Sequence, residues 1–177
     1  MDVRRVVTGH DASGKSVFVS DEEVSPLPLT GFHRLWGGDR ISEFPDDGSM
    51  PEHDMYFPPI GGFRFGMFSL PPETTAGSEV DATADLTDLA VEVPGLLRYM
   101  DVTDPGMHTT DTIDFEVVLE GTVVLELDGG AEVTLRPGDT VVQNGTRHRW
   151  RNPGDTTARL AVFMCGASHA DVPAADA

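Results

Sequence analysis

Two short stretches of the sequence hold side chains that can bind a metal ion or transfer protons. Residues 106–121, "GMHTTDTIDFEVVLEG", contain His108 and Asp114 at the start of a run of branched apolar residues. Residues 138–152, "GDTVVQNGTRHRWRN", contain a short apolar strand that ends at a glycine turn, and His148 at the start of a new strand. Imidazole nitrogens and carboxylate oxygens are common ligands of divalent metals, and they also act as general acids and bases. The two stretches together predict a metal or acid–base site.

The spacing of the first stretch requires a turn before the strand. Residues of one parity share a face of a strand, so His108, Thr110 and Asp114 point the same way. A straight strand of six residues spans about 20 Å, whereas metal ligands lie about 2 Å from one ion. His108 and Asp114 can therefore share an ion only if residues 110–112, "TDT", turn or bulge, which aspartate and threonine favour.

The second stretch has a clear inward and outward parity. His148, Trp150 and Asn152 share one face, and the three arginines at 147, 149 and 151 share the other. We expect the arginines to face solvent, and the imidazole, indole and amide to face inward.

The rest of the chain has the pattern of an all-β protein. Nineteen glycines and thirteen prolines divide it into short pieces with β-branched or aromatic alternation. Ten strands are predicted, at 4–9, 16–21, 33–37, 63–70, 113–121, 122–129, 131–138, 139–143, 147–152 and 157–166. One helix is predicted at 78–92, with Ser78 as its N-cap, and the aperiodic, proline-rich residues 43–62 predict a long loop that covers part of the molecule.

The two stretches together resemble the motifs of the cupin superfamily, G(x)5HxH(x)3–4E(x)6G and G(x)5PxG(x)2H(x)3N. In the first motif Asp114 stands where the family has glutamate, and Thr110 stands where it has the second histidine. In the second motif Gly145, His148 and Asn152 match, Gln143 replaces the proline, and the spacing from Gly138 is one residue short. N-terminal segments such as "RRVVTGHD" and "FPPIGGFRFGMFSLPP" also look like those of one group of small single-domain cupins.

The resemblance implies an all-β fold: a cupin-type double-stranded β-helix, or jelly-roll barrel, with an N-terminal strand extension and one short helix. We expect an N-terminal β-arm and covering loop at 1–62, the barrel at 63–166 and a flexible tail at 167–177. The resemblance also implies a metal held by His108, Asp114 and His148. Two histidines and one carboxylate favour iron(II), with zinc, manganese or nickel as other choices. The alternative is a metal-free barrel in which Asp114 and His148 form a hydrogen-bonded pair.

Several further residues are candidates for the site. Glu116 shares the parity of Asp114, so Asp114, Glu116 and His148 are predicted catalytic groups. The alternative is that this parity faces outward, since Phe115, Val117 and Leu119 form an equally good apolar face. Arg64, Tyr99, Thr110 and Trp150 are predicted to contact the substrate, because arginine pairs with a carboxylate. The aromatic residues Trp36, Phe63, Phe65, Phe68, Phe115 and Trp150 are expected to lie mostly in the core.

Composition limits the partners. Thirty acidic and twelve basic residues give a net charge of −18, which disfavours nucleic acid and anionic membranes. The single cysteine, Cys165, forms no intrachain disulfide, and no stretch has the length of a membrane span, so a soluble cytoplasmic protein is expected. The surplus strand pattern at the N-terminus predicts a homodimer in which this arm pairs with a neighbour's sheet edge.

The leading functional hypothesis is a small-molecule enzyme, metal-dependent, that acts on an organic acid, a phenol or a polyketide-like metabolite at the barrel mouth. Its chemistry would be that of an oxygenase, or of a lyase, dehydratase or isomerase. The resemblance also implies a role in secondary metabolism or catabolism. The alternative is a non-catalytic cupin that binds or senses a metabolite.

Overall fold

The computed structural model of the chain describes residues 1–74 and 86–170. Within these ranges the chain forms ten β-strands, a short α-helix and two 3-10 turns, and each of the ten predicted strands overlaps a strand of the structure. In chain order the elements are β1 Val3–His10, β2 Ser16–Val24, β3 His33–Gly38, β4 Phe63–Leu70, α2 Leu86–Glu92, η1 Leu96–Tyr99, β5 Thr112–Glu120, β6 Val123–Leu127, η2 Asp128–Gly130, β7 Glu132–Leu135, β8 Thr140–Asn144, β9 His148–Arg151 and β10 Ala158–Gly166.

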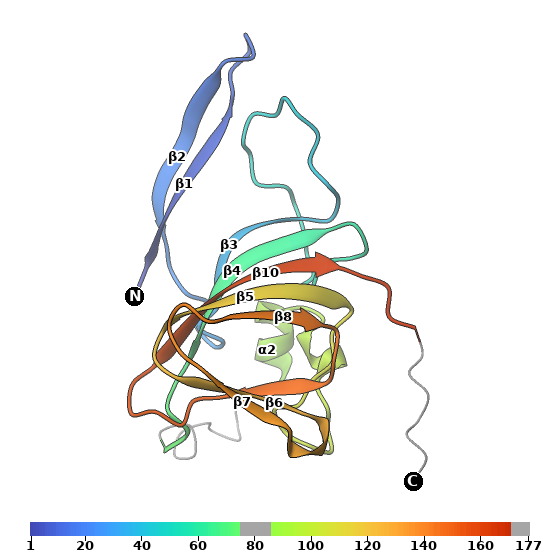
Figure 1. The fold of residues 1–177 in the computed structure, drawn as a ribbon. Helices are drawn as coiled ribbons and strands as arrows, with labels where there is room; N and C mark the ends of the chain where they lie inside the picture. The colour runs from blue at the N-terminus through green and yellow to red at the C-terminus, as the bar shows by residue number, and fades with distance from the viewer. Residues whose placement is uncertain (75–85, 171–177) are drawn as a thin grey trace.

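Eight of these strands form two antiparallel sheets that face each other as a barrel (Figure 1). The larger sheet has the order β3-β4-β10-β5-β8, and the smaller one has the order β7-β6-β9. Strands that are distant in sequence are neighbours in the larger sheet, since β10 lies between β4 and β5. The predicted all-β jelly-roll barrel is confirmed.

The larger hydrophobic cluster lies between the two sheets. Alternate residues of β5, β6 and β10 point inward, because successive side chains of a strand leave on opposite faces. The buried cluster consists of Val118, Val123, Leu125, Leu135, Ala158 and Leu160. A tight turn at residues 128–130 joins β6 to β7, and both Gly129 and Gly130 have the positive φ that favours glycine there.

The N-terminal strands β1 and β2 form a separate two-stranded hairpin that projects beyond β3 (Figure 1). Arg5, near the start of the hairpin, donates to the Leu35 carbonyl, and the His10 backbone, next to the hairpin turn, donates to the Asp46 carbonyl. We call residues 1–24 the arm. Most of β2 remains exposed.

The segment between β4 and β5 contains helix α2 and the 3-10 helix η1, and the segment between β3 and β4 is mostly a loop. Helix α2 falls within the predicted helix at 78–92, and the predicted N-cap Ser78 lies outside the described residues. Residues 43–62 contain no strand, and their tyrosine and phenylalanine at 56 and 57 reach the barrel interior. No helix within the described ranges is long and apolar enough to cross a bilayer.

The expectation that the aromatic residues lie mostly in the core is wrong for Phe65 and Phe115. Both side chains are more than 40% exposed, on the outer face of the larger sheet. Strand parity defines two faces, and β5 places its carboxyl groups inside and Phe115 outside. The open question about the orientation of β5 is thereby answered in favour of an inward Glu116.

Candidate functional site

A cavity of about 300 Å³ lies between the two sheets at the open end of the barrel. Its wall is mostly aromatic and aliphatic. Besides the tyrosine hydroxyl and the tryptophan indole, its polar side chains among the described residues are two histidines, one threonine and two carboxyl groups. The lining residues are Phe32, Tyr56, Phe57, Phe68, Leu70, Leu96, Met100, Gly106, His108, Thr110, Asp114, Glu116, His148, Trp150, Val162 and Met164. None of these described lining residues is a lysine or arginine. The cavity therefore suits a small, neutral and largely apolar ligand.

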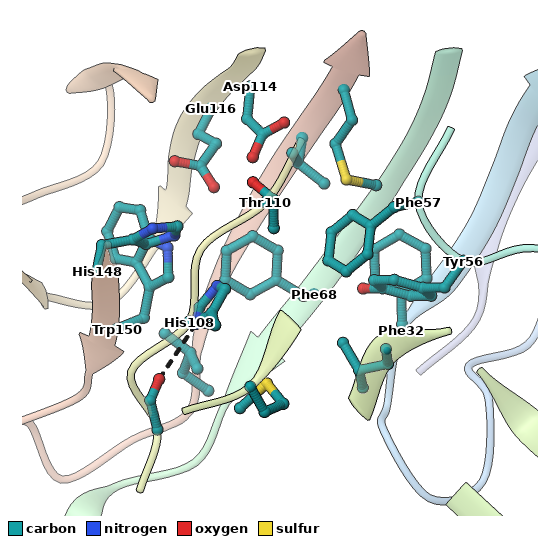
Figure 2. A pocket seen from close by; sticks show the side chains of 16 residues that line it. Phe32, Tyr56, Phe57, Phe68, His108, Thr110, Asp114, Glu116, His148 and Trp150 are labelled. Carbon is teal, nitrogen blue, oxygen red and sulfur yellow. Dashed lines mark hydrogen bonds between the residues drawn. The ribbon is translucent and has the colours of Figure 1, made fainter. Parts of the chain in front are cut away.

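Strand β5 brings Asp114 and Glu116 into this cavity. They are two residues apart, so their side chains leave the same face of the strand, and both are buried. Figure 2 shows the two carboxyl groups next to each other on β5, above the histidines. Asp114 Oδ1 and Glu116 Oε2 have no hydrogen-bond partner, although buried polar atoms are usually paired. These oxygens are available to a bound ligand.

Burial and mutual repulsion hold protons on this pair of carboxyl groups. Burial raises the pKa of Asp114 to about 6. Burial also raises the pKa of Glu116 to about 8, and the nearby Asp114 carboxylate adds to that rise. Two carboxylates without a cation between them do not both ionise easily. Near neutral pH the pair therefore keeps a proton, and the larger rise favours Glu116 as its holder.

The two histidines lie side by side on the facing side of the cavity. His108 precedes β5 and pairs with His148 of β9 through two backbone hydrogen bonds of 2.9 Å. Their ring centroids are 4.1 Å apart. Burial lowers the pKa of His108; burial, and secondarily the charge on His108, lower the pKa of His148 to about 4. Both imidazoles are therefore neutral near pH 7.

Backbone contacts orient both imidazole rings. Nδ1 of His108 lies 3.1 Å from the Gly106 carbonyl oxygen, and Nδ1 of His148 lies 2.8 Å from the Thr146 carbonyl oxygen. A carbonyl oxygen only accepts, so the contact of His108 assigns its ring proton to Nδ1 and leaves the lone pair on Nε2. Nδ1 of His148 has the Thr146 carbonyl as an acceptor and the Gln143 amide as a donor beside it, so either tautomer of that ring has a partner.

Gln143, which stands at the motif's proline position, fixes the turn before His148. Its amide Nε2 donates to the Thr146 carbonyl oxygen at 2.7 Å and to the Thr146 hydroxyl at 2.6 Å. The amide also lies 2.7 Å from Nδ1 of His148. The turn that a proline would stiffen through its ring is thus held by side-chain hydrogen bonds.

Ion pairs on the outer surface support the histidine loop. Arg147 donates to Asp101 at 2.8 Å and to Asp104 at 2.9 Å, while Arg149 pairs with Glu126 at 2.6 Å. The arginines do face outward, although they are partly buried by these acids. They tie strand β9 to the loop that leads into His108.

The three predicted metal ligands line the same cavity without converging. Within residues 1–74 and 86–170, no three histidine, cysteine, aspartate or glutamate side chains are placed to hold one ion. Figure 2 shows the reason, because His108 lies on the side of the cavity opposite to Asp114. The chain bends at Asp111, as the spacing required, but the bend leaves the two groups apart. This arrangement does not fit a three-ligand metal centre.

The four residues predicted to contact substrate fall into two groups. Thr110 and Trp150 line the cavity. The Arg64 guanidinium lies outside that lining, where it pairs with Asp39 at 2.6 Å and donates to the Gly38 carbonyl at 3.0 Å. Tyr99 also lies outside, and its hydroxyl is 3.4 Å from Asp111.

Sequence reasoning missed much of the aromatic wall. Tyr56 and Phe57 come from the loop at 43–62, and Phe32 precedes β3. Their rings form a chain of edge contacts, with centroids 5.1 Å apart for Phe32 and Tyr56 and 4.8 Å apart for Tyr56 and Phe57. The sequence signal that could have identified them was the adjacent Tyr56 and Phe57 in the loop at 43–62, which was expected to cover part of the molecule.

Comparison with known proteins identifies relatives of the chain. Residues 99–164 match the model of the cupin domain family. Phomopsin biosynthesis cluster protein C' of Diaporthe leptostromiformis is 32% identical over 168 residues, which cover 90% of this chain and 76% of that protein. The cupin-domain-containing oxidoreductase fogC of Aspergillus ruber is 28% identical over 155 residues, which cover 85% of this chain and 64% of that protein.

Solved structures of similar fold include a cupin 2 conserved barrel domain protein from Salinispora arenicola. It is 15% identical to this chain, covers 81% of it and 82% of its own length, and superposes with a TM-score of 0.43.

Proposed function

Because the chain belongs to the cupin superfamily, we propose that it is a small-molecule enzyme that transfers protons to and from a ligand in the barrel cavity. Its relatives include proteins of fungal secondary-metabolite clusters, some of them described as oxidoreductases. The single observation that carries the proposal is the pair of unpartnered buried carboxyl oxygens, on Asp114 and Glu116, at one cavity.

The substrate that fits is a neutral phenol or polyketide-like ketone. The wall is aromatic and aliphatic, which favours an apolar ring system. Among the residues that the structure describes, no cationic side chain lines the cavity to pair with a carboxylate, and the Asp114 charge would repel one. Of the substrate classes expected from the sequence, we therefore favour the phenolic and polyketide-like ones over organic acids.

The chemistry that fits is isomerisation or dehydration. Asp114 accepts a proton from a carbon next to the substrate carbonyl, and Glu116 donates its proton to the carbonyl oxygen, which yields an enol. If the next carbon, β to the carbonyl, carries a hydroxyl, that hydroxyl leaves with the Glu116 proton as water, and a double bond forms between the two carbons. No electron leaves the substrate in either reaction. The neutral imidazole of His108 accepts a hydrogen bond from a substrate hydroxyl at Nε2.

This proposal can be tested before the natural substrate is known. We would incubate the protein with a cyclic aromatic ketone in deuterium oxide and follow loss of the α-proton signal by NMR. We expect exchange in the wild type, and a loss of about 100-fold or more in Asp114→Asn and Glu116→Gln. Glu120→Gln, at an exposed position of the same strand, is the matched control. Binding of the ketone with equal exchange in all four proteins would contradict the acid–base roles and favour a binding protein.

A metal-dependent oxidoreductase is the second candidate. The observation that favours it is the pair of neutral imidazoles, whose ring centroids are 4.1 Å apart. The Asp114 carboxylate would have to move toward the two imidazoles to complete a three-ligand metal site. Equilibrium dialysis against iron(II), zinc, manganese and nickel tests it. About one equivalent, lost in His148→Ala, would support this candidate, and substoichiometric binding of every ion would rule it out.

A further inference from the structure

The hydroxyl of Tyr56 is a hydrogen-bond donor that faces the cavity. Tyr56 lines the cavity, and Figure 2 shows its hydroxyl pointing into the interior. Among the residues that the structure describes, no group forms a hydrogen bond with this hydroxyl, although a tyrosine hydroxyl inside a protein usually has a partner. Burial raises the pKa of Tyr56; the Arg34 charge lowers it by less, and the Asp114 charge adds to the rise. The hydroxyl therefore keeps its proton near neutral pH and can donate it in a hydrogen bond.

The peptide group before Tyr56 is held at both of its polar atoms. The Tyr56 N–H donates to the Pro94 carbonyl at 2.9 Å. The Met55 carbonyl belongs to the same peptide group, and it accepts from Nε of Arg64 at 3.3 Å and from Nη2 of Arg64 at 3.0 Å. Because a peptide group is planar, these contacts fix its plane and limit the directions in which the Tyr56 side chain can leave the backbone.

Two neighbouring rings limit the rotation of the Tyr56 side chain. Phe32 and Phe57 both contact the Tyr56 ring in edge-to-face geometry. Rotation about the side-chain bonds of Tyr56 would break both contacts. The backbone and the rings together keep the hydroxyl directed at the cavity.

Arg64 has no donor left for a ligand. Its side chain is buried on β4. Nη1 donates to the carbonyls of Gly38 and Phe63, at 3.0 and 2.9 Å, and Nη2 donates to Asp39 at 2.6 Å. Together with the two bonds to Met55, these contacts use all five N–H groups of the guanidinium. A lysine has three donors and could not make this set. Arg64 therefore holds the loop on the barrel and contacts no ligand.

We propose that Tyr56 is a ligand-binding residue whose hydroxyl donates to a second oxygen of the substrate, and that Arg64 is the positioning residue that holds Tyr56 in place. Figure 2 shows Tyr56 and Glu116 on different sides of the cavity, so the two residues serve oxygens at different ends of one ligand. The ligand is then a neutral ring system with an oxygen at each end, and the oxygen at the Tyr56 end is an acceptor such as a carbonyl. This inference rests on the proposed function, in that a neutral ketone binds in the cavity, and it does not depend on the proton transfer.

The test is the binding of two ligands of equal shape, measured by isothermal titration calorimetry. The first is a bicyclic aromatic ketone with an acetyl group at the far end of its rings, and the second has an isopropenyl group there. The measured quantity is the ratio of their affinities. Tyr56→Phe keeps the ring and removes the hydroxyl, so we expect this ratio to fall about threefold to tenfold. Tyr99→Phe is the matched control and should keep the wild-type ratio, because the Tyr99 hydroxyl lies outside the cavity lining.

The role of Arg64 is tested by the same ratio. Arg64→Met removes the contacts to the Met55 carbonyl, so we expect it to lower the ratio by a similar factor. Adding Tyr56→Phe to Arg64→Met should then lower the ratio no further, whereas a general loss of stability would leave the two effects additive. Circular dichroism will establish that each variant is folded. Arg64→Lys, with a smaller expected fall, replaces Arg64→Met if the latter does not fold.

The outcomes separate this inference from the proton-transfer proposal. An unchanged ratio in Tyr56→Phe would mean that Tyr56 only packs against the ligand, and would overturn the inference. Additive effects of the changes at residues 56 and 64 would overturn the positioning role of Arg64. A wild type that binds neither ligand would overturn the inference together with the proposed substrate class. If the ratio falls as expected but the α-proton does not exchange in deuterium oxide, the role of Tyr56 stands and the proton transfer fails.

Discussion

The Glu116→Gln substitution tests the state of the buried carboxyl pair without a substrate. The pKa of Glu116 is raised from 4.5 to about 8 by burial and by Asp114. At pH values between 4.5 and about 8, Glu116 is ionised in the unfolded chain and protonated in the folded chain. Unfolding therefore releases a proton, and the free energy of unfolding falls as pH rises through this window. The stabilisation by protonated Glu116 is fully present below its unfolded pKa of 4.5, and it is lost once pH passes its folded pKa of about 8.

The size of this effect follows from the shift. At about 1.36 kcal/mol for each pKa unit, the full shift corresponds to about 5 kcal/mol. Water that enters the 300 Å³ cavity weakens the desolvation, so we expect about 2–4 kcal/mol. Glutamine has the same shape and no charge. Relative to wild type, Glu116→Gln should therefore gain about 2–4 kcal/mol in free energy of unfolding between about pH 5 and about pH 9.

Urea unfolding at a series of pH values, followed by Trp fluorescence, measures this difference. The relevant quantity is the free energy of unfolding of the variant minus that of the wild type, as a function of pH. Glu120→Gln, with its exposed side chain on the same strand, should give a flat difference. If the Glu116→Gln difference is equally flat, Glu116 is not a buried neutral acid, and its role as proton donor fails with it.

Four further changes follow from single contacts. An added methyl at Gly66 would collide with the Phe32 ring, so Gly66→Ala should cost about 1–3 kcal/mol in urea unfolding and weaken ligand binding. Asn152→Ala removes the amide that donates to the carbonyls of residues 70 and 156, and should cost about 2–4 kcal/mol by the same measurement. Leu160→Ala opens the core, with an expected cost of about 2–5 kcal/mol. Thr110→His restores the second motif histidine and should raise zinc binding, by dialysis, at least about tenfold.

The strands and the inward turn of β5 could be predicted because they depend on local patterns. Glycine and proline mark the ends of the strands, and the alternation between them fixes the parity of each strand. Residue spacing predicted that Asp114 and Glu116 share a face, and that His148 lies opposite Arg147 and Arg149. Each of these statements concerns neighbours in sequence, which extended backbone geometry determines.

The convergence of the ligands could not be predicted, because it depends on the path of the chain between strands. His108 and Asp114 are six residues apart, and the bend between them decides whether they meet. Likewise Tyr56 reaches the cavity from a loop without periodicity. The outward position of Phe115 was equally hidden, since an apolar face and a carboxylate face alternate on one strand and hydrophobicity alone favours burying the former.

The departures from the cupin motif and the carboxyl pair have a common physical explanation. Two inward carboxyl groups on one strand need a positive charge or a proton to offset their repulsion. With threonine at 110 and the shorter aspartate at 114, the nitrogen and oxygen donors do not meet, and the proton on Glu116 then takes the neutralising role. This gives a direct comparison between the two candidate functions. An ion bound near Asp114 would lower the pKa of both carboxyl groups. Added zinc should then flatten the pH dependence of wild-type stability if the metal site forms, and leave it unchanged if the pair works by proton transfer alone.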